Sequence, residues 1–226
     1  PKIYMVQPAS ARAVALNLKT GVKRVAYING AGDNVVESIE SVGVVVEKFD
    51  AEAITLEKLK SFDAVIIGIR AFNVNESLSY KKNVLWAYTK QGGNLLIQYN
   101  TSRGLKTKSI TPLSIQLSRD RVTDENAEVK LLDSSHPVLN SPNKISSNDF
   151  KGWVQERGLY FPNQWDKEFT PLIEMNDKGE SPKKGALLVA KYGKGKLVYT
   201  GLSFFRQLPE GVPGAYRLFF NLIANN

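Results

Sequence analysis

The sequence feature that most constrains the fold is the run DAVIIGI at residues 63–69, which is apolar or glycine at every position after Asp63. A strand with one face in water alternates apolar and polar residues. A continuous apolar run is instead typical of a strand buried on both faces. Strand-like runs that also contain polar residues occur at 22–28, 44–49 and 94–99. Because helix-like segments separate these runs, the pattern predicts an α/β domain built on a mostly parallel sheet.

The helices expected between these strands are short. Residues 35–42 place valine and isoleucine side chains on one face, and Gly43 after them suits a helix C-cap. Another short helix is expected at 56–59. A longer helix begins after the capping residue Asn75 and ends at the glycine pair 92–93.

The second half of the chain has a different pattern. Residues 100–162 are rich in serine, threonine, asparagine and aspartate and show few periodic segments. We interpret them as a long polar insertion. Strands are expected after it at 170–175, 186–192 and 196–202. The glycines around Lys194 favour a hairpin between the last two, which adds an antiparallel extension to the sheet.

A final amphipathic helix is expected from Pro213, since proline is favoured in the first turn of a helix. We therefore expect residues 21–226 to form a single α/β domain. Residues 1–20 are expected to be a linker or an edge segment from a preceding domain. Because the chain starts at Pro1 without an initiator methionine or a signal-peptide pattern, we interpret it as a piece of a longer protein or as a mature product.

The composition excludes several kinds of chemistry. The 226 residues include no cysteine and a single histidine, His136. A disulfide, a cysteine nucleophile and the common zinc sites of cysteine or several histidines are therefore ruled out. A serine-histidine-aspartate triad would need His136, which lies in a turn-like Ser-Ser-His-Pro context. Metal binding by carboxylates alone stays open, but no cofactor or metal site is predicted.

The charge balance restricts the partners. Lysine and arginine number 30 against 22 acidic residues, which gives a net charge of +8. The lysines occur in small separated groups, whereas nucleic-acid binding favours a clustered basic stripe with arginine and aromatic residues. We therefore expect no nucleic-acid partner, while acidic glycans and a negatively charged partner domain are equally allowed. No apolar run approaches the roughly 20 residues that span a bilayer, so no membrane span is expected.

The carboxyl ends of the predicted parallel strands are the first candidate site. Ligands of open parallel sheets bind beyond these ends. The turn at 29–33 could bring a ligand close to the backbone, but it lacks a dinucleotide or Walker pattern. The structural alternative is that Gly30 and Gly32 allow a tight turn and that the next acidic residue caps the helix. The candidate residues at this rim are Asp33, Arg70, Gln98 and Asn100.

The strand at 94–99 lies where related sheets carry a nucleophile elbow. Such an elbow needs a serine or cysteine between glycines, beside a base. The residues present are Gln98, Tyr99, Asn100, Thr101 and Ser102, with no histidine nearby in the sequence. We therefore predict no catalytic residue at this position.

Three polar segments supply the other candidate residues. Carboxylate pairs serve as acid and base in glycoside hydrolysis, and aromatic faces suit sugar rings. The alternative is that arginine–carboxylate groups pin a long loop to its scaffold. The candidates are Arg119, Asp120, Arg121 and Asp124 in the first segment, Glu156 and Arg157 in the second, and Arg206 in the third.

Six segments together resemble the C-terminal domain of large bacterial PIG-L (LmbE-like) deacetylases. They are YINGAGD at 27–33, GIRAFN at 68–73, GGNLLIQYN at 92–100, SRDRVTDE at 118–125, GWVQERG at 152–158 and TGLSFFRQLP at 200–209. The resemblance implies a flavodoxin-like three-layer sandwich, similar to class I glutamine amidotransferases and ThuA-like proteins. It also implies an exported multidomain protein whose zinc-dependent deacetylase domain precedes this one.

The resemblance does not carry catalysis onto this chain, because the amidotransferase cysteine and the zinc-binding motifs are absent. One hypothesis is a non-catalytic accessory domain that binds carbohydrate or packs on the deacetylase domain, its partner. The alternative is a cryptic glycan hydrolase that uses Asp120 or Asp124 with Glu156, which requires the carboxyl groups to lie roughly 5–9.5 Å apart.

Overall fold

The expected strands form the centre of the molecule. In the computed structural model, which describes residues 13–225, they build one sheet in the order β2-β1-β3-β4-β11-β10-β8. The pairs from β2 through β11 are parallel, and β10 is antiparallel to both β11 and β8. This confirms the mostly parallel sheet and the hairpin. The strands are β1 (Arg24–Ile28), β2 (Val45–Phe49), β3 (Ala64–Ile67), β4 (Asn94–Ile97), β8 (Thr170–Pro171), β10 (Leu187–Tyr192) and β11 (Gly195–Thr200).

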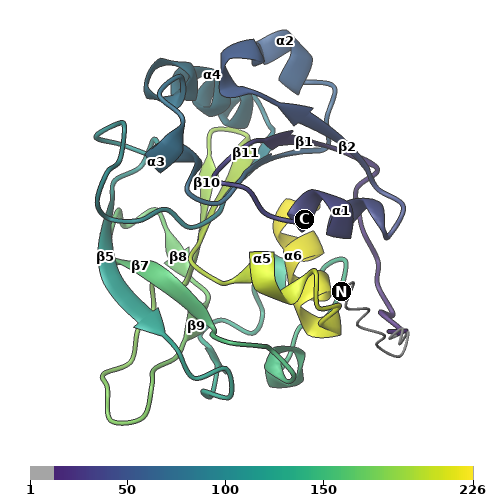
Figure 1. Ribbon diagram of the computed structural model, residues 1–226, viewed down its shortest axis with the longest axis vertical. Helices are drawn as coiled ribbons and strands as arrows, with labels where there is room; N and C mark the ends of the chain where they lie inside the picture. The colour runs from purple at the N-terminus through teal and green to yellow at the C-terminus, as the bar shows by residue number, and fades with distance from the viewer. Residues whose placement is uncertain (1–12, 226) are drawn as a thin grey trace, which may run out of the picture.

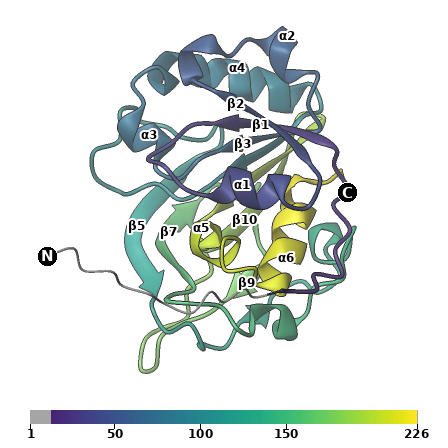
Figure 2. The same cartoon turned by 45° about the vertical axis from the view of Figure 1, so that its right-hand side comes forward.

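Helices cover both faces of this sheet (Figures 1 and 2). One layer contains α1 (Val35–Glu40), α5 (Phe204–Gln207) and α6 (Pro213–Ile223). The opposite layer contains α2 (Leu56–Leu59), α3 (Ala71–Val74) and α4 (Leu78–Lys90). Short 3-10 helices lie at Ala51–Ala53, Pro137–Leu139 and Ser147–Phe150. The three-layer α/β architecture expected from the sequence is therefore confirmed.

The apolar run at 63–69 has the two buried faces that its sequence predicted. Ile66 packs into the core beneath α1 and α6, and Ile67 packs into the core beneath α2 and α4. Both side chains are fully buried. Burying each one contributes about 1.5–3 kcal/mol relative to an exposed position, so alternate residues of one strand hold both helical layers.

The polar insertion contains regular structure that its sequence pattern does not predict. β5 (Ile115–Val122) and β7 (Gly158–Trp165) form an antiparallel ribbon. The alternation of apolar residues in β5 stops at Ser118, and the pairing shows register irregularities at Gln116–Arg121. Because of these two features, β5 cannot be recognised in the sequence by an alternation of apolar and polar residues. Leu159 donates a backbone hydrogen bond to Gly201 (2.9 Å), which fixes the ribbon beside the end of β11.

The expected strand at 170–175 is divided between two sheets. β8 pairs with β10, whereas β9 (Ile173–Glu174) pairs with β6 (Lys130–Leu131). Residues 1–12 of the predicted segment 1–20 lie outside the described residues. Its remaining part forms no helix or strand, and the Lys19 amide donates to Asn143 (2.9 Å).

Candidate functional site

A pocket of about 270 Å³ lies beside the carboxyl ends of β4 and β11, and we call it the carboxyl-edge pocket. It collects side chains from β5, from the loop before β7 and from the start of β7. Its lining residues are Arg119, Arg121, Glu156, Leu159 and Tyr160. Three of the residues predicted from the polar segments therefore meet in one pocket, although they come from two separate parts of the chain.

The alternation of β5 explains which of its charges reach this pocket. Successive side chains of a strand point to opposite faces. Arg119 and Arg121 accordingly line the carboxyl-edge pocket, whereas Asp120 lines a different pocket together with Lys184. Both arginine side chains are exposed.

Aromatic rings form the wall between the pocket and the sheet. Tyr99, which follows β4, stacks on Tyr160 with ring centroids 6.4 Å apart and planes 8° apart. Phe205 lies 5.3 Å from Tyr99 on the side of α5. Burial raises the pKa of Tyr99, and the nearby charges of Arg70 and Arg206 oppose that rise. The hydroxyl therefore stays protonated at neutral pH and can donate a hydrogen bond.

Glu156 and Arg206 form an ion pair at the same edge. The Arg206 Nε lies 2.8 Å from Glu156 Oε1, and the guanidinium also bonds the side chain of Gln155. The guanidinium carbon lies 4.9 Å from the centre of the Phe205 ring. The Glu156 side chain is only 15% exposed. This carboxylate is therefore held by an arginine rather than free in an open cleft.

Arg70 occupies a sharp turn between β3 and α3. Its φ of 54° is left-handed, and its amide donates to the Tyr99 carbonyl at 2.8 Å. A strand, a strained turn and a helix are the arrangement that presents a nucleophile in elbow sites. The sequence pattern places such a position after 94–99, but the turn lies after β3. A guanidinium stays protonated and cannot act as the nucleophile.

Positive φ values are concentrated around this site. Among the described residues, the non-glycine residues with positive φ are Asn17, Arg70, Gln155 and Tyr160. Three of these four adjoin Tyr99 or the Glu156–Arg206 pair. Left-handed backbone costs roughly 1–2 kcal/mol for a residue with a side chain, and such strain is often concentrated at ligand sites.

The other rim candidates are engaged in hydrogen bonds within the fold. Both carboxylate oxygens of Asp33 accept from the Tyr27 hydroxyl (2.8 and 2.7 Å), and Oδ1 also accepts from the Val35 amide. Gln98 donates to the same hydroxyl at 3.2 Å, while its buried Oε1 has no partner. Burial, followed by the charge of Asp33, raises the pKa of Tyr27 well above 10. Asn100 accepts from the Phe72 amide and is fully buried. These contacts fit the structural alternative for Asp33, and they show that Gln98 and Asn100 are engaged within the fold.

Two further candidates lie away from the pocket. Arg157 is buried, and its guanidinium donates to the carbonyls of Ala127 and Phe150. Burial lowers its pKa to about 10. Asp124 is exposed and accepts from the Asn126 amide in the loop that Asp177 holds. Arg157 thus holds two parts of the insertion together through backbone carbonyls, whereas the structural alternative expected an arginine–carboxylate pair.

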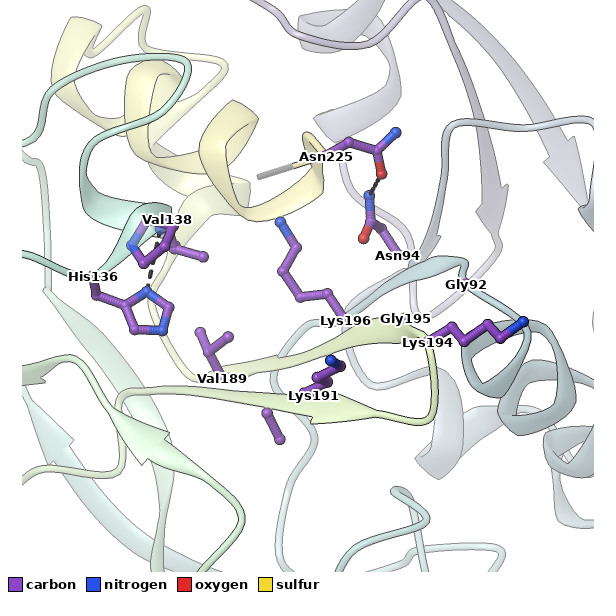
Figure 3. Close-up of a pocket in the computed structure, with 12 residues that line it drawn as sticks. Gly92, Asn94, His136, Val138, Val189, Lys191, Lys194, Gly195, Lys196 and Asn225 are labelled. Carbon is purple, nitrogen blue, oxygen red and sulfur yellow. Dashed lines mark hydrogen bonds between the residues drawn. The ribbon is translucent and has the colours of Figure 1, made fainter.

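A second pocket, of about 390 Å³, lies at the opposite edge of the sheet, and we call it the amino-edge pocket (Figure 3). It is lined by lysines of the β10–β11 hairpin, by His136 and by Asn94. The Lys196 side chain extends toward the end of α6, and Lys194 points away from the centre of the pocket (Figure 3). The Lys196 Nζ donates to the carbonyls of Asn221 (3.3 Å) and Ala224 (2.5 Å). In the sequence these lysines are only part of a scattered set of charges.

Two features are absent from the described part of the chain. Within residues 13–225, no group of three histidine, aspartate or glutamate side chains is placed to hold a metal ion. No helix within the same residues has the length and apolar character needed to cross a membrane.

Comparison with known proteins shows the fold. No protein-family model and no curated protein sequence matches the chain. A GMP synthase-like protein from Thermoplasma acidophilum has a TM-score of 0.55 at 11% identity, over 89% of this chain and 94% of its own. A ThuA-like protein from Bacteroides uniformis has a TM-score of 0.51 at 13% identity, over 94% and 93%. The fold is that of glutamine amidotransferase-like and ThuA-like proteins.

The same fold also occurs within a longer chain. A β-galactosidase from Bacillus circulans sp. alkalophilus is similar with a TM-score of 0.55 at 12% identity. The match covers 92% of this chain but 31% of the β-galactosidase. At these identities the likeness concerns architecture alone. The chemistry of the site must therefore be argued from the residues of this chain.

Two aromatic residues of the site were not among the predicted site residues. The sequence places Tyr99 in a segment that lacks an elbow nucleophile, and it places Tyr160 in the polar insertion. A signal did exist for Tyr160, since the segments 152–161 and 203–207 both mix aromatic and charged residues. What the sequence could not show was that these two segments meet at the end of β4.

Proposed function

We propose that this chain is a non-catalytic domain that binds carbohydrate at the carboxyl-edge pocket, as an accessory part of a PIG-L/LmbE-like deacetylase. The observation that supports binding is the composition of this pocket. Tyr160 offers an aromatic ring, and arginine and glutamate side chains beside it offer hydrogen bonds to hydroxyl groups. Aromatic rings beside polar groups suit sugars, which have both apolar ring faces and hydroxyls.

The accessory role is supported by three observations. Four of the six segments that resemble the deacetylase C-terminal domain contribute to the pocket or its aromatic wall, through Tyr99, the β5 arginines, Glu156 and Phe205. The turn that could present a nucleophile carries Arg70 instead. A similar fold also makes up 31% of a β-galactosidase chain, so it is compatible with a place in a larger protein.

The hydrolase alternative has less support from the geometry. Glu156 is paired with Arg206, and Asp120 lines another pocket. Asp124 lies in the loop held by Asp177. A glycosidase needs two carboxyl groups that face one substrate, and the described residues do not bring these carboxylates into one pocket.

The binding proposal is tested by titrating the protein with neutral, acetylated and acidic oligosaccharides, including chitotriose, at millimolar concentration. We expect saturable chemical-shift changes at Tyr99 and Tyr160, and a loss of affinity of at least fivefold in Tyr160→Ala. Tyr80→Ala is the matched control, because Tyr80 is an exposed tyrosine on α4. Absence of saturable binding for neutral, acetylated and acidic sugars would overturn the binding role.

The parent is tested separately by reading the coding sequence upstream of Pro1. Histidine and aspartate motifs of a zinc deacetylase there would support the proposed context. A different upstream domain, or none, would overturn it without affecting the binding role.

A further inference from the structure

We propose that the ligand of the carboxyl-edge pocket is an acidic glycan, whose carboxylate or sulfate group is bound by Arg119 and Arg121. This inference rests on the proposed carbohydrate-binding function and specifies its ligand class. It follows from the charge balance of the pocket, from the geometry of the two arginines and from the rings beside them.

The charge balance leaves two cations without a partner. Glu156 is the acidic residue that lines the pocket, and it is engaged with Arg206 at 2.8 Å. Within residues 13–225, neither Arg119 nor Arg121 makes an ion pair or a side-chain hydrogen bond. By contrast, Arg24 and Arg217 in the same range each form an ion pair with a carboxylate. The pocket therefore has an excess of two positive charges, which an anionic ligand would neutralise.

The residue type and its spacing favour a single acidic group. A guanidinium presents parallel N–H donors that match a carboxylate or sulfate, and it does so better than a lysine ammonium. Residues two apart on a strand lie roughly 7 Å from each other on the same face. The flexible side chains of Arg119 and Arg121 can therefore converge on one anionic group between them.

The remaining features point to a sugar rather than a free anion. The volume of about 270 Å³ lies just below the usual range of ligand pockets, which starts at roughly 300 Å³. This size suits one sugar unit of a chain better than a large cofactor. Tyr160 supplies an aromatic face beside the arginines, and its ring is fixed by stacking on Tyr99. Arg70 adds positive charge near Tyr99.

The geometry of Tyr160 supports a ligand-facing role. Its φ of 53° is unfavourable for a residue with a side chain. Yet its ring remains partly exposed in the pocket instead of being buried in the core. The fold thus holds a costly backbone conformation that keeps this ring beside the two arginines.

The experiment compares trigalacturonic acid with its fully methyl-esterified form by isothermal titration calorimetry. The two probes share the same sugar units and differ in the negative charges. We expect the acid to bind at least tenfold more tightly than the ester at low salt, and to weaken as salt screens the charges. A sulfated disaccharide forms a third arm and distinguishes sulfate from carboxylate. Preference for either anionic group supports an acidic glycan.

Variants locate the anionic contact. Arg119→Ala and Arg121→Ala should each lose at least tenfold in affinity for the acid and less than twofold for the ester. Arg121→Lys should recover part of the loss, since it restores charge but not the planar fork. Lys194→Ala removes an exposed cation at the amino-edge pocket and should leave both affinities unchanged.

The outcomes separate the two proposals. If the ester binds as tightly as the acid, the acidic-ligand inference is overturned and the carbohydrate-binding role stands. If the acid binds but the arginine variants retain full affinity, the inference is also overturned, because the contact lies elsewhere. If neither the acidic nor the neutral sugars bind, the proposed function itself fails.

Discussion

The two edges of the parallel sheet each have a pocket with several cations, but the cations have different surroundings. At the carboxyl edge, Arg119 and Arg121 are exposed and line an open pocket. At the amino edge, Lys196 is held by the last carbonyls of α6. These carbonyls at the end of the helix occupy the donors of the Lys196 side chain. The comparison indicates that the partners of a cation, rather than its presence, decide whether a pocket can take an anion.

A buried hydrogen-bond network connects the elements at the amino edge. Asn221 of α6 is fully buried, accepts from the Asn143 amide (2.9 Å) and donates to the carbonyls of Val138 (2.8 Å) and Asn143 (2.6 Å). These bonds tie the last helix to the loop that lines the amino-edge pocket. The residues of this edge are therefore expected to serve stability, and those of the carboxyl edge to serve binding.

The largest expected effect comes from breaking this amino-edge network. Asn221→Leu keeps the number and branching of the side-chain heavy atoms but cannot pair with the buried amide and carbonyls. Because each buried polar group left unpaired costs about 1–3 kcal/mol, we expect a loss of roughly 3 kcal/mol or more in the free energy of unfolding. Urea unfolding followed by circular dichroism measures it.

The matched change at the carboxyl edge is Arg121→Ala. An exposed side chain without a partner should alter the free energy of unfolding by less than about 0.5 kcal/mol. The division of roles between the edges would be wrong if this variant lost as much stability as Asn221→Leu.

The next effect concerns pH and Lys196. Burial lowers its pKa to about 7, whereas an unfolded lysine titrates near pH 10.4. Between these values the unfolded chain binds a proton that the folded chain lacks, so stability rises with pH. We expect a gain on the order of 2 kcal/mol from pH 7 to 9 in urea unfolding. His136 does not contribute to this window, because burial lowers its pKa below 6.5.

Lys196→Met is the variant that tests this assignment. It keeps an apolar stem of similar length and removes the titrating ammonium, so the rise in stability between pH 7 and 9 should largely disappear. An unchanged slope in Lys196→Met would show that another group causes the rise. The absolute stability also shifts, since the bonds to the helix carbonyls are lost, but the slope is the quantity compared.

How much the sequence could predict differs between these regions for physical reasons. Ile66 and Ile67 belong to a local apolar run whose burial on both faces needs no long-range information. The carboxyl-edge pocket instead joins Arg121 to Glu156 across an irregular ribbon. Its pairing depends on a register that no short pattern encodes. The candidate residues could be listed from the sequence, but which of them share a pocket could not.

Two arginines show the same limit of prediction from the sequence. Arg157 and Arg206 both lie in polar segments that contain aromatic residues. In the structure Arg157 donates to interior carbonyls, while Arg206 pairs with Glu156 at the pocket. Local composition identifies both as polar anchors, whereas only the packing of the insertion separates the structural one from the one at the site.

The smallest expected effect concerns the turn at Arg70, where the carboxyl edge is strained. Its φ of 54° suits glycine, and its side chain is exposed. Arg70→Gly and Arg70→Ala both remove the guanidinium, but only glycine relieves the left-handed strain. We expect the glycine variant to be more stable than the alanine variant by about 1 kcal/mol, a difference reduced by the greater entropy of unfolded glycine. Chemical denaturation of the two variants under identical conditions measures this difference directly.

The Arg70→Gly and Arg70→Ala variants also separate the effect of backbone strain from the effect of the lost charge. If Arg70 contributes only its positive charge to ligand binding, both variants should lose the same modest factor in affinity for an acidic sugar. Stability and affinity would then change independently at one residue. Equal stability of the two variants would contradict the expected strain at this turn, and it would weaken the link between the positive φ values and the pocket. The backbone strain at Arg70 can thus be measured from the stability of these two variants, even when the ligand of the carboxyl-edge pocket is not known.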